Sequence, residues 1–122
     1  MLPCDYHGAV ESYLKCLAVA REIGDRRGEG GSLGNLGLAY FGLGEYQLAV
    51  QFNQQHLAIA REIGDRRGES SALFNASQVL EELGKRTEAI RCAEEALTIY
   101  QQIESPHAEI VQKLLAEWRK SG

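Results

Sequence analysis

The ten residues AREIGDRRGE, from Ala20 to Glu29, return without a change forty positions later, from Ala60 to Glu69. Leu43-Gly44 recurs at the same spacing as Leu83-Gly84, and Ala49-Val50 as Ala89-Ile90. Self-similarity at this period is typical of a solenoid of stacked helical hairpins. We therefore predict an all-α fold.

Apolar residues at helical spacing, interrupted by glycines, divide the chain into about six predicted helices. Gly24 and Gly64 are helix stops, and the aspartate after each is a favoured N-cap residue. We predict helices over residues 6–23, 26–43, 45–63, 66–83 and 85–103, and a last helix that follows the N-cap Ser105 and ends near Lys120. Residues 1–122 would form one domain, in which 6–23 is the unpaired second helix of a repeat, 25–63 and 65–103 are repeats, and 105–120 is a capping helix. The predicted core positions are Leu36, Tyr40, Leu57, Leu73, Leu80, Ala89 and Leu97.

Composition excludes several classes of partner. The 122 residues carry a formal net charge of −4 and are 44% hydrophobic, so neither nucleic acid nor an anionic membrane, which attract basic faces, is expected as a partner. No apolar run approaches the roughly 18 residues of a spanning helix. The odd number of cysteines fits a reducing compartment, and we expect a cytoplasmic protein in which Cys4, Cys16 and Cys92 are buried as small apolar residues.

The repeat carries a recognisable consensus: Leu33-Gly34-Asn35, Ala39-Tyr40, Leu43-Gly44 and Ala49-Val50, joined to the next repeat through GDRRGE. From about Tyr6 to Glu109 the chain resembles a tetratricopeptide repeat protein, in the long, forty-residue form of the Leu-Gly-Asn repeat proteins and related bacterial scaffolds. The resemblance implies a right-handed superhelix of helix pairs. It also implies a non-catalytic interaction module that binds a peptide or a partner helix in a concave groove lined by the first helix of each pair.

Family geometry and helical spacing suggest which side chains line that groove. Asn35 and Asn75 occupy matching positions, and an amide can donate to and accept from a peptide backbone at once. The lysines and arginines with which many tetratricopeptide domains clamp a C-terminal carboxylate are missing from these faces, so binding of a chaperone tail is not expected. The implied groove residues are Asn35, Leu38, Phe41, Phe74, Asn75, Gln78 and Glu81, with Gly31, Gly34 and Ser71 on the same faces.

Two interpretations remain open for the arginine pairs Arg26-Arg27 and Arg66-Arg67. They stand at helix starts, where the helix dipole disfavours cations. They either form pairs with nearby glutamates or capture an acidic segment of a partner.

The second predicted helix is unusually rich in glycine. Its glycines either let neighbouring helices approach closely or keep the floor of a groove open, with Gly37 the strongest candidate for packing. Near one seam between repeats, three polar residues replace small or apolar residues of the sister repeats: Asn53, His56 and Ser77. They form either a mutually satisfied buried cluster or the edge of a binding site.

Catalytic and cofactor motifs are not apparent. Gly84-Lys85 lacks the glycine that a phosphate-binding loop needs five residues earlier. His7, His56 and His107 are far apart in sequence, and neighbouring carboxylates such as Glu81-Glu82 do not face each other on a helix. We expect no enzyme activity, no cofactor and no metal.

The predicted N-terminal helix matches the second helix of a pair. We expect Ala9, Val10, Tyr13 and Leu14 to be partly uncovered there, which suggests an alternative function: self-assembly, with a homodimer formed through residues 6–23.

Overall fold

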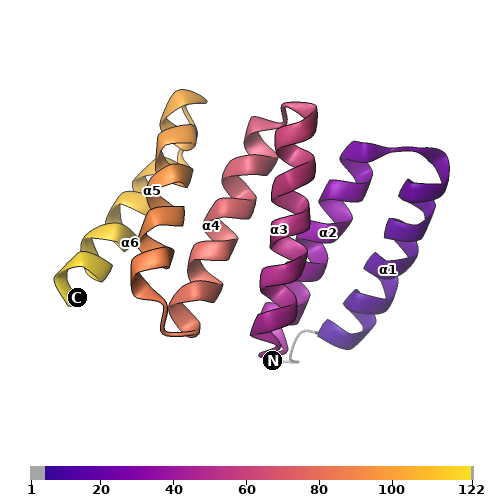
Figure 1. Ribbon diagram of the computed structural model, residues 1–122, viewed down its shortest axis with the longest axis horizontal. Coiled ribbons are helices and arrows are strands. Elements are labelled where there is room, and N and C mark those ends of the chain that lie inside the picture. Colours follow the sequence, from indigo (N-terminus) through magenta and orange to yellow (C-terminus); the bar gives the residue numbers. More distant parts are fainter. Residues whose placement is uncertain (1–4, 122) are drawn as a thin grey trace.

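The computed structural model describes residues 5–121, which form six helices in a row, each packed on the next (Figure 1). α2 and α4 also contact each other. This arrangement confirms the predicted all-α solenoid. None of the described helices is long and apolar enough to cross a membrane. The helices are α1 (Tyr6–Ile23), α2 (Arg26–Gly42), α3 (Tyr46–Ile63), α4 (Arg66–Glu82), α5 (Arg86–Gln102) and α6 (His107–Ser121).

The helix ends follow the predicted stop and cap signals. Gly24 has a φ of 74°, in the left-handed region that glycine adopts without strain. The Asp25 carboxylate then accepts a hydrogen bond from the amide of Gly28 at 2.9 Å, which caps α2. Ser105 accepts from the amide of His107 at 3.2 Å. Each observed helix lies within about two residues of its predicted bounds, as expected for end assignments.

Buried apolar side chains form two clusters, one toward each end of the row. The N-terminal core is built around Leu17, Leu33, Leu36 and Ile59. The C-terminal core joins α4, α5 and α6 and contains Leu73, Ala89, Ala93, Ala96, Ile99, Tyr100, Val111, Leu115 and Trp118.

Three of the predicted core residues, Leu36, Leu73 and Ala89, are buried. The other four are only half-buried, because a row of helix pairs leaves side chains at each seam partly open to solvent. They still pack against the two clusters, and they are Tyr40, Leu57, Leu80 and Leu97.

The prediction that the cysteines are buried is wrong for Cys16, which is exposed, and too strong for Cys92, which is half-buried. Cys4 lies outside the described residues. Ala96, forty residues after His56 and eighty after Cys16, is fully buried. The difference arises because α5 is packed between two helices, whereas α1 has a described neighbour only in α2.

Three large apolar side chains of α1 are exposed: Leu14, Val19 and Ile23. Val19 is 55% exposed, whereas Ile59, its counterpart in α3, is 6% exposed. Ile23 is 70% exposed and Leu14 45%. Of the residues expected there, Ala9, Val10 and Tyr13 are half-buried, so the exposure is greatest toward the C-terminal end of α1.

Candidate functional site

α2 and α4, the first helices of successive pairs, border a hollow of about 430 Å³, here called the α2–α4 hollow. Four of the predicted groove residues line it together: Asn35 and Leu38 from α2, and Phe74 and Asn75 from α4. The spacing of forty residues places Asn35 and Asn75 at equivalent positions on the two helices. Gly31, Gly34 and Ser71 also line the hollow.

The other three predicted groove residues, Phe41, Gln78 and Glu81, line a separate hollow of about 330 Å³ next to α6. Glu81 is already engaged there, because Nε of Arg86 lies 2.6 Å from its carboxylate. Arg86 also donates to the carbonyl of Trp118 at 3.0 Å. This second hollow is therefore tied to the C-terminal helix, and its acidic group has an internal partner.

The α2–α4 hollow has a neutral lining. No Asp, Glu, Lys or Arg among residues 5–121 lines it. Its hydrogen-bonding groups are the amides of Asn35 and Asn75, the hydroxyl of Ser71, and aromatic and imidazole side chains. Asn35 is exposed and Asn75 half-buried, so both amides remain within reach of a ligand backbone. Leu38 and Phe74 add apolar surface beside them.

An aromatic stack closes the α6 side of this hollow, and sequence reasoning missed it. The rings of Tyr100 and His107 lie 5.3 Å apart and nearly parallel, and Phe74 meets Tyr100 edge-on at 6.4 Å. His56 and His107, separated by fifty-one positions, line the same hollow. The sequence carried no signal for this, because residues so far apart in the chain share a hollow only through tertiary packing.

The arginine pairs lie away from this hollow and are mostly engaged in ion pairs. Arg26 reaches Glu29 at 2.8 Å and Glu62 at 2.6 Å. Arg27 pairs with Asp65 at 3.3 Å. The hydrogen bonds from Arg21 and Arg26 hold the pKa of Glu29 below its usual value, and Glu62 and Glu29 raise the pKa of Arg26.

The same arrangement recurs one repeat later. Arg66 reaches Glu69 at 2.8 Å and also bonds Gln102. Arg67 has no ion pair among the residues that the structure describes. The contacts favour the interpretation of these arginines as paired surface groups, with Arg67 as the exception.

The polar side chains Asn53, His56 and Ser77 do not hydrogen-bond to one another. Ser77 donates its hydroxyl to the carbonyl of Phe74 at 2.6 Å rather than to the cluster. Both amide atoms of Asn53 and Nδ1 of His56 are buried without a hydrogen-bond partner among the described groups. Burial lowers the pKa of His56, and the nearby charge of Asp65 opposes that shift.

These two side chains explain the glycines of α2. A Cβ on Gly37 would lie 2.6 Å from Oδ1 of Asn53, and one on Gly34 would lie 2.6 Å from Nδ1 of His56. Gly31 differs, because a Cβ there would meet nothing within 4 Å. Both interpretations of the glycines therefore apply: Gly34 and Gly37 allow close packing, and Gly31 leaves the hollow open.

Among residues 5–121, no three His, Cys, Asp or Glu side chains gather closely enough to hold a metal ion.

Comparison with known protein families gives two overlapping matches, residues 4–62 and 31–102, both to the family described as Tetratricopeptide repeat. Together the matches run from residue 4 to residue 102 of the 122. No significant match to the chain is found among curated proteins.

Proposed function

Since the chain belongs to the tetratricopeptide repeat family, whose repeats are generally protein-interaction modules, we propose that it binds an extended, uncharged peptide segment in the α2–α4 hollow. Members of the family are typically non-catalytic scaffolds, and we propose the same for this chain.

The observation that carries this proposal is the neutral lining with two matched amides. Asn35 and Asn75 each offer a donor and an acceptor, which is the complement of a peptide unit. Leu38 and Phe74 lie beside them and can cover apolar side chains of the ligand. A carboxylate entering the hollow would lose water without meeting a cation, which is unfavourable. The hollow therefore favours the middle of a chain over its charged C-terminus.

The proposal is tested with a library of neutral octapeptides displayed on phage, from which the tightest binder is taken for titration. Replacing Asn35 and Asn75 together by alanine should weaken that peptide about tenfold, the scale of one or two hydrogen bonds. Helicity should not change, because solvent-accessible polar side chains contribute little to stability. The matched control changes Gln47 and Gln101 to alanine, two exposed amides outside the hollow. Equal binding by the two double variants would contradict the proposal, and a parallel loss of helicity would make the asparagines structural.

Salt dependence separates this mode from capture of an acidic segment by Arg27 and Arg67. Affinity for a neutral peptide should stay constant as sodium chloride rises from about 0.05 to about 0.5 M, because screening acts on charges. A steep fall in affinity would instead support binding of an acidic ligand by Arg27 and Arg67.

The exposed face of α1 favours a second candidate function, self-association with another copy. Covering Val19 and Ile23, as α2 covers Ile59, would remove a large apolar surface from water. Two copies pairing through this face form an isologous contact, in which each residue meets the same surface of its partner.

Replacing Val19 and Ile23 with glutamate should shift a dimer to monomer in sedimentation velocity while the far-UV spectrum is retained. The matched control places glutamate at Leu48, an exposed apolar residue on α3. These sites are preferable to Tyr13, which packs against the N-terminal core. A wild-type chain that sediments as a monomer at high concentration would contradict self-association.

A further inference from the structure

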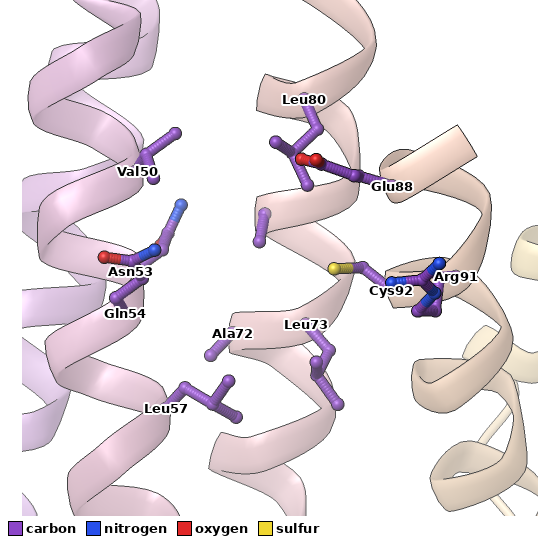
Figure 2. A pocket seen from close by; sticks show the side chains of 11 residues that line it. Val50, Asn53, Gln54, Leu57, Ala72, Leu73, Leu80, Glu88, Arg91 and Cys92 are labelled. Atoms are coloured by element: carbon purple, nitrogen blue, oxygen red, sulfur yellow. The ribbon is translucent and has the colours of Figure 1, made fainter. Parts of the chain in front are cut away.

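A third hollow, of about 310 Å³, lies between α3 and α5 with α4 as its floor (Figure 2). Here it is called the seam cavity. Asn53 and Leu57 line it from α3, Ala72, Ala76 and Leu80 from α4, and Cys92 from α5. In Figure 2, Cys92 points its sulfur from α5 toward α4, and Asn53 lies across the space on α3.

The seam cavity is distinct from the α2–α4 hollow. Successive residues of a helix are rotated by about 100°, so Ala72, Ala76 and Leu80 lie on a different side of α4 from Ser71 and Asn75. The two sites share no lining residue. A ligand in one would therefore leave the other accessible.

The preceding repeat shows what normally fills this space. A shift of forty residues maps the seam cavity onto the seam between α1 and α3, where the rings of Tyr40 and Phe52 stack with centroids 5.4 Å apart. Both rings pack against the N-terminal core. At four positions a bulky side chain of the first seam is replaced by a smaller one in the second: Tyr13 by Asn53, Leu36 by Ala76, Tyr40 by Leu80, and Phe52 by Cys92.

These replacements remove three aromatic rings from the second seam. The space opens to solvent at its rim, where Gln54, Glu88 and Arg91 are exposed, so a small ligand can enter it. The volume of the cavity falls at the lower end of the range of small-molecule sites. The geometry thus matches one or two aromatic rings in size and shape.

Asn53 adds a polar anchor to this apolar space. The residue is 2% exposed, and neither atom of its amide has a hydrogen-bond partner among the described groups. The amide lies against Gly37 of α2, so it gains a partner from the cavity only when the side chain turns toward that space. At the rim, Glu88 and Arg91 carry opposite charges, which favours a ligand without net charge.

We propose that the seam cavity binds a small, neutral aromatic compound that carries one hydroxyl or carbonyl group. Its ring takes the place of the Tyr40 and Phe52 side chains of the first seam and packs against Leu57, Leu80 and the sulfur of Cys92. Its polar group pairs with the Asn53 amide, which turns from Gly37 toward the cavity when the ligand binds. This proposal does not depend on peptide binding in the α2–α4 hollow.

Two probes that differ by one hydroxyl test the proposal: p-cresol, the side chain of tyrosine, and toluene, that of phenylalanine. Titration of the full chain followed by amide NMR should show saturable shifts at Leu57, Leu80 and Cys92 with both probes. p-Cresol should bind about tenfold more tightly, because it alone can pair with Asn53. The change Asn53→Leu should remove this preference while toluene still binds.

Filling the cavity is the decisive control. Leu80→Tyr with Cys92→Phe rebuilds the stack of the first seam and should abolish binding of both probes, as should Ala76→Leu alone if the double variant folds poorly. Asn35→Ala with Asn75→Ala, which alters the other site, should bind p-cresol like the wild type. Absence of saturable shifts at millimolar probe would overturn the proposal. So would equal binding by the filled variants, or shifts confined to the α2–α4 hollow.

Discussion

At the level of single residues, Gly31 and Gly37 of α2 differ in what a side chain at their position would meet. In an exposed helix interior, replacing glycine by alanine stabilises by up to about 1 kcal/mol. Gly31 has open space around its missing Cβ, whereas Gly37 faces the amide of Asn53, which is itself buried and cannot move freely.

We therefore expect Gly31→Ala to raise the free energy of unfolding by up to about 1 kcal/mol and Gly37→Ala to lower it. Denaturant unfolding followed by circular dichroism measures both. Adding Asn53→Ala should rescue Gly37→Ala, since it removes the atom that the new methyl group meets. Equal effects of the two glycine substitutions would mean that the α2–α3 seam is loosely packed.

His56 should make stability depend on pH in the mildly acidic range. Burial lowers its pKa in the folded chain, whereas in the unfolded chain it titrates near about 6.5. The unfolded state then binds more protons below about pH 6.5, so stability falls as pH drops from there toward the folded pKa.

Denaturant midpoints at about pH 7.5 and about pH 5.5 measure this effect, chosen to bracket the ordinary histidine pKa. His56→Ala, which places there the residue found at position 96, should flatten the difference. If the wild type and the variant lose the same stability as pH falls, groups other than His56 cause the pH dependence.

At the scale of elements, each copy of the repeated decapeptide builds the same bridge across a helix turn. Glu29 accepts from both Arg21 at the end of α1 and Arg26 at the start of α2. Glu69 does the same with Arg61 and Arg66. Because the arginines are substantially exposed, each bridge orients neighbouring helices more than it stabilises them.

Glu29→Gln should therefore cause a small loss of stability at neutral pH, at the level of an exposed ion pair. The pKa of Glu29 is lowered in the folded chain, so its contribution is present above the unfolded glutamate pKa of about 4.3. It is lost as pH falls through the folded pKa. Thermal unfolding of wild type and variant should accordingly converge at low pH. Glu22→Gln, an exposed glutamate near the same turn, is the control and should change little at any pH.

At the scale of the whole molecule, the two core clusters predict that a loss of packing at one end of the row affects that end more than the other. In a row of helices, each element contacts mainly its neighbours, so a local loss of packing spreads only partly. Leu33 and Leu73 occupy equivalent positions forty residues apart, and each is almost fully buried in a different cluster.

Leu33→Ala and Leu73→Ala should each cost about 2–5 kcal/mol, as for other buried leucines. Amide hydrogen exchange should separate them: Leu33→Ala accelerates exchange most in α1 and α2, and Leu73→Ala most in α5 and α6. Uniform acceleration along the chain in both variants would show that the row unfolds as one cooperative unit.

Local sequence patterns were sufficient to predict the helices, their ends and their order. These features depend on local chemistry: apolar spacing selects the buried face of each helix, and glycine with aspartate stops one helix and caps the next. The repeat also indicated that Asn35 and Asn75 occupy equivalent positions, because residues at one period recur on one face of a row. The structure places both on the α2–α4 hollow.

Only the tertiary structure decided which faces have neighbours and which side chains meet. Position 16 is exposed and position 96 buried, although they are equivalent in the repeat, because α5 alone of the two helices is packed on both sides. His56 and His107, fifty-one positions apart, line one hollow only in the folded chain. The seam cavity arises from four replacements on three helices, of which only Asn53 stands out in the sequence. The cavity forms only when the helices pack together, because side chains that are distant in the chain jointly fill the space between helices.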